Sequence, residues 1–285
     1  MPCRGPPPKD GTENPLAARR CFAVVGTYAR SCRVTARTKS SVAAEPAVPA
    51  PRGDAEVLLV DGRGGYLLWC ADDVPRRRYS GLWVTRLPDA AERTMLVAGL
   101  HELVTVKDGA VDSAVSLLAA HWAGHHEPMY PAVAARCIGA VPPTRRCEGR
   151  LPDGTPFCLE REVVLLRAAP GREPALLVRW RNRSGAAVRL LVRPLLGMHE
   201  VDRLPPAREG LDGAVQARGA SWGVRPLADL PTLWLTADGV AAFAAEPTHY
   251  RGFLYATDRD RGYDHLGDRW SPGLLDLLIP AGEVA

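Results

Sequence analysis

The feature that most constrains the fold is a succession of short β-rich runs separated by turn residues. Glu56–Val60 is one such run, and a glycine-rich turn at residues 61–65 ends it. Residues 157–166 place apolar side chains on one face, although Arg161 interrupts that face. Leu274–Ile279 is the last run. Many short strands with little helical pattern predict an all-β, mainly antiparallel fold, either a sandwich or a barrel.

The clearest local signal is a pair of alternating runs around residues 182–185 (Asn-Arg-Ser-Gly). Apolar residues alternate into this turn and out of it again at Leu176, Val178, Trp180, Val188, Leu190 and Val192. Alternation on both sides of a short polar turn predicts a β-hairpin. Weaker signals predict further strands at residues 78–87, 214–217, 233–236 and 240–244.

The N-terminal leader, residues 1–54, has a different composition. Prolines crowd both of its ends, and little periodic apolar pattern lies between them. Such a segment cannot bury enough apolar surface to fold, so we expect it to be disordered. A start codon assigned too far upstream would give the same pattern. The folded domain is therefore expected to cover residues 55–285.

Charge and cysteine content narrow the classes of partner and compartment. The formal net charge is +4, and residues 1–52 hold nine basic and three acidic residues, so the folded part is nearly balanced. This balance gives no reason to expect nucleic acid or an anionic membrane as a partner. The seven cysteines are an odd number without a CxxC pair, which indicates reduced thiols and a cytoplasmic protein. A transit peptide is the open alternative for the Arg-bearing leader.

Ser221 lies in a G-x-S-x-G sequence at residues 219–223. This pattern marks a hydrolase nucleophile only on a sharp turn from a strand into a helix. Arg225-Pro226 follows here, and no helical pattern leads away. We therefore interpret residues 219–223 as a turn between β segments, and a serine hydrolase using Ser221 stays a remote alternative.

Two clusters of metal-binding residue types do not fit a metal site. His121 and His125 have the i, i+4 spacing of a zinc site, with His126 beside them, but Gly124 and Pro128 argue against a helix. We expect a loop with packing or solvent-facing histidines.

Acidic residues at positions 258, 260, 264 and 268 resemble a calcium loop, but the EF-hand register fails at Tyr263 and Arg269. Internal ion pairing explains these acids better.

Asp72 and Asp73 are adjacent, so on a strand they would point to opposite faces, and no catalytic carboxylate pair stands out. We expect no metal and no cofactor.

Several stretches resemble one family in order and spacing. They are residues 58–66 (LLVDGRGGY), 76–84 (RRRYSGLWV), 191–196 (LVRPLL), 250–255 (YRGFLY), 261–264 (RGYD) and 271–273 (SPG). Together they resemble the N-terminal domain of bacterial and archaeal type glycogen debranching enzymes, over residues 56–283. Three places depart from the family pattern: Ser80 stands where the family has histidine, Val74-Pro75 replaces Asn-Thr, and residues 68–70 replace small residues.

The resemblance implies a large antiparallel β supersandwich that packs against a following (α/α)₆ barrel. In the family that barrel carries the catalytic carboxylates and hydrolyses α-1,6-linked glucose at branch points. We therefore expect no catalytic residue in this chain, a truncated enzyme that is inactive alone, and a catalytic domain supplied in cis or as a separate chain. The expected ligand is an α-glucan, either glycogen or maltodextrin. A free-standing carbohydrate-binding or regulatory module is the alternative.

Seven residues are candidates for contact with glycan: Arg77, Tyr79, Trp83, His199, Arg261, Tyr263 and Asp264. Aromatic rings stack on sugar rings, and Arg or Asp side chains form paired hydrogen bonds to vicinal hydroxyl groups. Tyr79 and Trp83 could equally belong to the core of the sandwich, and Arg261 could pair with Asp264.

Overall fold

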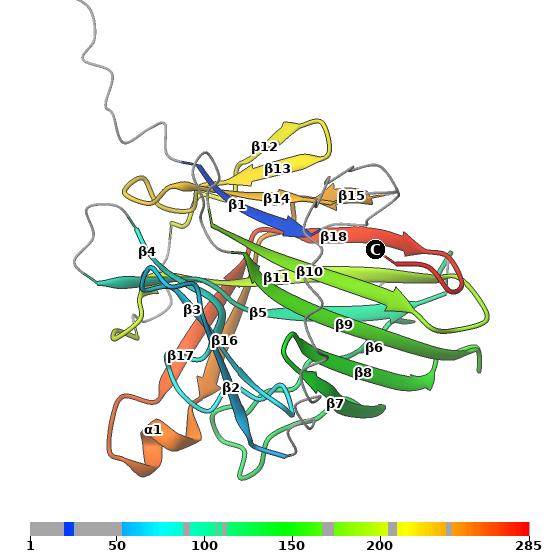
Figure 1. The fold of residues 1–285 in the computed structure, drawn as a ribbon, viewed down its shortest axis with the longest axis horizontal. Helices are drawn as coiled ribbons and strands as arrows, with labels where there is room; N and C mark the ends of the chain where they lie inside the picture. The colour runs from blue at the N-terminus through cyan, green and yellow to red at the C-terminus, as the bar shows by residue number, and fades with distance from the viewer. Residues whose placement is uncertain are drawn as a thin grey trace, which may run out of the picture.

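The computed structural model describes residues 20–25, 53–87, 92–106, 108–109, 113–166, 174–204, 210–237 and 241–284. In these residues the regular structure is almost entirely β-strand, as the sequence predicts (Figure 1). The one helix among them is α1 (Ala256–Asp260), a single short turn. Within the same ranges no helix has the length and apolar character needed to cross a membrane.

The first sheet is built mainly from the middle of the chain. Its described strands are β1 (Arg20–Val25), β7 (Ala134–Ala140), β8 (Pro143–Arg150), β9 (Pro156–Leu166), β10 (Ala175–Asn182), β12 (Val215–Arg218), β13 (Ser221–Val224) and β14 (Thr232–Thr236). They are ordered β12-β13-β14-β1-β10-β9-β8-β7. Except at β1, neighbouring strands in this sheet are antiparallel.

The second sheet contains strands from residues 56–116 and 241–279, together with one strand, β11, from between them. They are β2 (Glu56–Val60), β3 (Tyr66–Cys70), β4 (Gly81–Arg86), β5 (Arg93–Thr105), β6 (Val115–Ser116), β11 (Val188–Glu200), β15 (Ala241–Ala244), β16 (Thr248–Leu254), β17 (Leu266–Ser271) and β18 (Leu274–Ile279). Its main path is β15-β18-β11-β5-β4-β3-β2. The β6 strand pairs with β5, and β17 pairs with β11 and with β16, so these strands branch off the main path.

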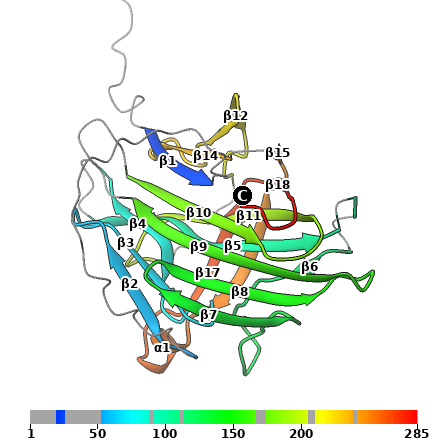
Figure 2. The same cartoon turned by 45° about the vertical axis from the view of Figure 1, so that its right-hand side comes forward.

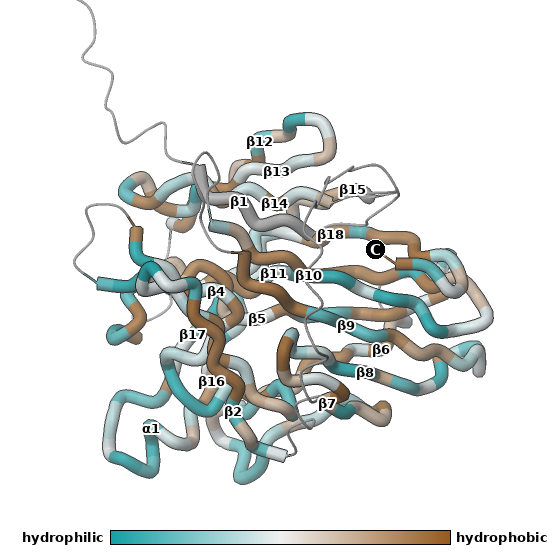
Figure 3. Tube along the Cα trace, in the orientation of Figure 1, coloured by the Kyte–Doolittle hydropathy of each residue, from teal (hydrophilic) through white to brown (hydrophobic). Residues whose placement is uncertain are grey.

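The two sheets enclose one large apolar core, so the fold is a β-sandwich (Figures 1 and 2). Trp180 and Val178 of β10 belong to the same buried cluster as Leu190 of β11 and Ile279 of β18. Figure 3 shows β18 largely in hydrophobic colours, whereas the segment around α1 is mainly hydrophilic. Hydrophilic loops at one end of an apolar sandwich are a typical place for a binding site.

The predicted hairpin at residues 182–185 is wrong in its pairing, although both strands exist. β10 pairs with β9 and β1, whereas β11 pairs with β5, β17 and β18 in the other sheet. The turn therefore crosses from one sheet to the other. The buried Asn182 side chain supports this corner, because its Nδ2 donates to the carbonyls of Ala186, Ile279 and Pro280. Alternation indicates only which face of a strand is buried. Because β10 and β11 each bury one face in the shared core, both alternate although they belong to different sheets.

The other predicted strands are present with small differences in their bounds, but the sequence analysis does not predict β3, β5, β6, β7, β8, β13, β16 or β17. The strand expected at residues 78–87 begins only at Gly81, because Ser80 N donates to Arg77 O and closes a turn. The leader contributes β1, which the sequence analysis does not expect. β1 lies parallel to both β10 and β14 in the middle of the first sheet. Residues 1–19 and 26–52 lie outside the described residues, so the expectation of disorder there stays a prediction.

The β16 strand packs on β5 through a half-buried histidine. His101 Nδ1 lies 2.8 Å from Tyr250 Oη on β16, and Nε2 lies 3.0 Å from Ser116 Oγ on β6. Burial, helped by the charge of Arg193, lowers the pKa of His101 to about 4. The neutral imidazole is therefore the form that the folded state stabilises.

This lowered pKa predicts acid sensitivity. The pKa of an unfolded histidine is about 6.5, so the unfolded chain binds the proton more tightly than the folded one. The free energy of unfolding should therefore fall as the pH drops from about 6.5 towards 4. We expect His101→Gln to flatten this dependence in thermal melts, and exposed His126→Gln to leave it unchanged. Parallel pH curves for the wild type and His101→Gln would contradict the prediction.

Candidate functional site

Three loops meet at the end of the molecule that carries α1 (Figure 1). We call residues 71–80, 121–130 and 255–265 the loop cluster. The first loop joins β3 to β4, and the third contains α1 and joins β16 to β17. Loops held together on a rigid sheet are the usual position for binding residues.

Hydrogen bonds hold the first and third loops together. Thr257 N donates to Arg76 O at 3.0 Å, and Arg78 N donates to Asp258 Oδ2 at 2.6 Å. Asp258 is buried, with 3% of its surface exposed. A buried carboxylate that accepts a backbone N–H fixes the position of both loops.

The second loop is tied to the same unit. Tyr130 Oη donates to Asp72 Oδ2 at 3.0 Å, which links the second loop to the first. His121 O accepts from Leu254 N, and Ala123 N donates to Gly252 O, which links it to β16. These hydrogen bonds join the three loops into one continuous surface.

A tyrosine stands on each loop of the cluster. Tyr130 and Tyr263 are 54% and 55% exposed, and Tyr79 is half-buried. The guanidinium of Arg78 lies over the ring of Tyr263 at 5.6 Å, and that of Arg77 lies over the ring of Tyr79 at 5.7 Å. Tyrosine rings with arginine donors beside them suit ligands that have both apolar faces and hydroxyl groups.

A wide groove of about 920 Å³ adjoins the loop cluster on the outer face of the second sheet. Its lining comes from β2, the 61–65 turn, β3, the first loop, the start of β5 and the two residues after β11, and it includes Arg77 and Tyr79. Leu58 and Val60 line it with 59% and 58% of their surface exposed. Its volume is within the range of pockets that take organic ligands.

The polar groups of the groove are paired with one another. Arg77 Nε donates to both carboxylate oxygens of Glu56, at 2.9 and 3.0 Å, and Nη1 donates to Tyr79 Oη. Tyr66 Oη donates to the carbonyl of Tyr79, and Arg93 lies over the Tyr66 ring. These contacts hold the aromatic rings in place before any ligand arrives.

The glycine turn beside the groove follows from its sequence. Asp61 Oδ1 accepts from Arg63 N and Gly65 N, which folds the turn back on itself. Gly62 and Gly64 have positive φ angles of 78° and 93°, which favour glycine. A Cβ at Gly65 would lie 2.2 Å from Asp61 Oδ2 and 3.0 Å from Val84 O, so no other residue fits there.

A family model described as glycogen debranching enzyme N terminal matches residues 55–136 and 143–285. The chain belongs to this family. No curated protein and no solved structure matches the chain. The family match contains every residue of the loop cluster and of the groove, so the expected resemblance is confirmed over the folded region. β1 precedes the matched residues.

Five of the seven residues expected to contact glycan lie in this part of the debranching-enzyme domain. Arg77 and Tyr79 belong to both the first loop and the groove. Arg261, Tyr263 and Asp264 follow α1, and all three are exposed. Both side chains are exposed, and no ion pair joins Arg261 and Asp264 in the described structure.

The other two candidates are buried. Trp83 has no exposed surface and belongs to the main core. His199 is 5% exposed, its Nδ1 donates to Glu200 O, and its Nε2 lies 3.4 Å from Arg269 Nη1. Side chains this deeply buried offer a sugar almost no surface to contact, so we leave both residues out of the site.

Sequence reasoning missed Tyr130 and Asp72 as parts of one surface. Neither lies within a motif that resembles the family, and their contact joins positions 58 residues apart. The only signal in the sequence was the residue type of Tyr130, because a tyrosine after Pro128 and Met129 stands out in an expected loop. Its partner could not be identified from spacing.

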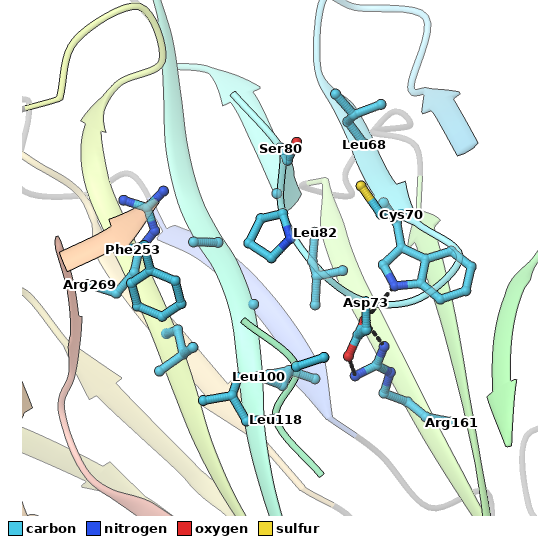
Figure 4. Close-up of a pocket in the computed structure, with 17 residues that line it drawn as sticks. Leu68, Cys70, Asp73, Ser80, Leu82, Leu100, Leu118, Arg161, Phe253 and Arg269 are labelled. Atoms are coloured by element: carbon cyan, nitrogen blue, oxygen red, sulfur yellow. Dashed lines mark hydrogen bonds and ion pairs between the residues drawn. The ribbon is translucent and has the colours of Figure 1, made fainter. Parts of the chain in front are cut away.

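A buried charge cluster anchors the first loop to both sheets. We define it as Asp73, Glu102, Arg145 and Arg161. Arg161 Nη2 donates to Asp73 Oδ1 at 2.6 Å (Figure 4). Arg161 Nη1 donates to Glu102 Oε2 at 3.0 Å. Arg145 Nη1 donates to Asp73 Oδ2 at 2.7 Å. The cluster has two positive and two negative groups, so its charges balance.

Two indoles complete the buried charge cluster. Trp69 Nε1 donates to Asp73 Oδ1, and Trp180 Nε1 donates to Glu102 Oε1. Burial alone would raise the pKa of Asp73, but the charges of Arg161 and Arg145 hold it below its usual range. Asp73 also has a φ of 67°, rare for a residue other than glycine. This backbone is held in place by the four hydrogen bonds that its carboxylate accepts.

The cavity beside Asp73 and Arg161 is too small for a sugar. It encloses about 50 Å³ between Ser80, Phe253 and these two residues (Figure 4). This volume is far below the roughly 300 Å³ at which pockets for organic ligands begin. The groove, not this cavity, is the candidate site for a carbohydrate.

Ser221 does not lie on a nucleophile elbow. Residues 219–220 form the turn between the antiparallel strands β12 and β13, and Ser221 pairs with Arg218 across that turn. Ser221 Oγ lies 2.8 Å from Thr236 Oγ1 on β14. The interpretation as a turn between β segments is confirmed for residues 219–220, whereas residues 221–223 belong to β13. The strand-to-helix context of a serine hydrolase is contradicted.

The histidine and aspartate clusters are also explained by local contacts. His121 lies in a loop, as expected, and its Nε2 is 3.0 Å from His125 O. Asp260 pairs with Arg259, as expected from ion pairing, but Asp258 and Asp268 accept backbone N–H groups instead. Among the residues that the structure describes, no group of three metal-binding side chains comes together.

Proposed function

We propose that this domain binds α-glucan at the loop cluster and the adjoining groove, and positions it for a debranching (α/α)₆ domain. The observation that carries the proposal is the meeting of three loops, each with a tyrosine, within the region matched by the debranching-enzyme family. The chemistry is binding and orientation. Hydrolysis at the branch point belongs to the catalytic domain, in cis or as a separate chain.

The geometry supports contact with sugar in two ways. Tyr263 offers an exposed ring on which the apolar face of a glucose unit can stack. Arg261 and Asp264, exposed beside it, can form paired hydrogen bonds with vicinal hydroxyl groups. In the groove, Tyr79 and Arg77 offer the same combination.

The partner domain is supported by a different observation. Leu58 and Val60 expose apolar surface on a strand at the edge of the second sheet. Because both residues also line the groove, a partner domain that contacts them would form one wall of the glucan site rather than cover it. A free-standing carbohydrate-binding module would bind glucan equally well without this contact. We place the protein in the cytoplasm, where glycogen is degraded.

Binding of glycogen and maltoheptaose to the full chain tests the proposal. We expect measurable binding without release of reducing sugar. Tyr263→Ala should weaken binding by about two- to tenfold, because an aromatic stacking contact contributes about 0.5–1.5 kcal/mol. The control is Val141→Ala, since Val141 is 66% exposed and lies outside the loop cluster and the groove. Wild-type protein that binds neither glucan would contradict the proposal.

A further inference from the structure

Arg269 of β17 is a buried positive charge whose contacts are all with uncharged groups. It is 4% exposed and lines the small cavity of Figure 4. Its Nη2 donates to Tyr255 Oη, and its Nη1 donates to the carbonyl of Asp268 at 2.9 Å. Nη1 also lies 3.4 Å from His199 Nε2. Since a guanidinium only donates, Nε2 is the acceptor there and the imidazole brings no charge.

The carboxylates around Arg269 are engaged elsewhere. Asp258 of α1 and Asp268 of β17 accept backbone N–H groups, and neither forms an ion pair with Arg269 in the described structure. Asp73 lines the same cavity, but it belongs to the buried charge cluster, whose charges already balance. A buried charge without a partner is costly, and a guanidinium cannot shed its proton to avoid that cost. Arg269 therefore calls for a negative partner.

The cavity offers such a partner a place and hydrogen-bond donors. A guanidinium has five N–H donors, and its three contacts leave at least two without an acceptor among the described residues. Ser80 lines the same cavity, and its Oγ accepts from Arg77 N, so its own O–H can donate to a ligand. Figure 4 shows Arg269 across the cavity from Asp73 and Arg161. The volume of about 50 Å³ limits the ligand to a few atoms.

We propose that this cavity binds one small monovalent anion of the size of chloride, held by Arg269 with a further hydrogen bond from Ser80. Donors without acceptors select an anion, and the single unbalanced charge of Arg269 selects one negative charge. The site is separate from the glucan groove, although Leu68 lines both. A bound ion joins β17 to the end of the first loop, so it stabilises the folded state.

Thermal melts of the full chain in sodium chloride and in sodium gluconate of equal concentration test the proposal, because gluconate is too large for the cavity. At a chloride concentration about ten times the Kd, the melting temperature should be about 3–6 °C higher in chloride than in gluconate. Arg269→Met should remove this difference. Arg251→Gln is the matched control and should keep it, since Arg251 is exposed on the neighbouring strand β16.

Crystals of the wild type grown in bromide locate the ion directly, and so decide the matter even if Arg269→Met does not fold. Anomalous scattering should place bromide in the cavity beside Arg269 and Ser80. Equal melting temperatures in the two salts would overturn the proposal. So would an Arg269→Met variant that keeps the full difference, or bromide found only elsewhere. Glucan binding enters none of these measurements, so the proposed function is tested independently.

Discussion

Arg161→Ala is expected to lower the free energy of unfolding by about 3–5 kcal/mol, the usual cost of removing one partner from a buried ion pair. Arg161 is 4% exposed and bonds to both Asp73 and Glu102. Without it, Glu102 keeps the indole of Trp180 but has no positive partner among the described residues. Chemical denaturation with a two-state fit measures the effect.

Arg179→Ala is the matched control for Arg161→Ala. Arg179 lies on β10, which pairs with β9, the strand that carries Arg161. Its guanidinium forms an ion pair with Glu162 at 2.8 Å. Both partners of this pair are about one quarter exposed, so solvent screens the interaction. Its loss should cost about 1 kcal/mol or less. Equal destabilisation by the two substitutions would show that burial of the charge cluster does not determine its contribution.

Arg161 also illustrates what the sequence can and cannot predict. The alternation in residues 157–166 places Arg161 on the apolar face, and the structure buries it there. The sequence therefore signals a buried charge. Its partners Asp73 and Glu102 lie 88 and 59 residues away, on a loop and on a strand of the other sheet. Nothing in the local pattern identifies contacts at that separation.

The same limit applies to the sheets. Period-two alternation identifies β10 and β11 because each buries one face. It does not specify the neighbouring strand, since the backbone hydrogen bonds that join strands are the same for every sequence. A short polar turn favours direct pairing, yet here the buried Asn182 turns the chain into the opposite sheet. The existence of β10 and β11 was therefore predictable, and their neighbours in the two sheets were not.

The candidate site was predictable where a family motif provided it. Arg77, Tyr79 and Tyr263 lie in motifs that resemble the family, and the structure places them on one connected surface. Trp83 and His199 show the opposite case. Trp83 lies in the motif at residues 76–84 and His199 lies on β11 just after the motif at residues 191–196, but the direction of a side chain on a strand decides between core and surface. A bulge near His199, where Met198 has a φ of 52°, further obscures that direction.

Trp83→Ala should destabilise the protein by about 3–5 kcal/mol, the usual cost of truncating a fully buried tryptophan. Trp83 has no exposed surface, and its Nε1 has no hydrogen-bond partner in the described structure. Trp83→Phe should cost less, because it keeps most of the apolar contact and removes a buried N–H that bonds to nothing. Denaturant unfolding of both variants measures the difference.

Glucan binding by the folded Trp83→Phe variant decides whether Trp83 contacts sugar. Because the indole is enclosed by the core between the two sheets, we expect affinity for glycogen to equal that of the wild type at a temperature where both are folded. Tyr263→Ala, measured in the same series, should lose affinity without losing stability, since its ring is 55% exposed. Weakened binding by Trp83→Phe with unchanged stability would mean that the indole reaches the glucan, and that this part of the core opens when the ligand binds.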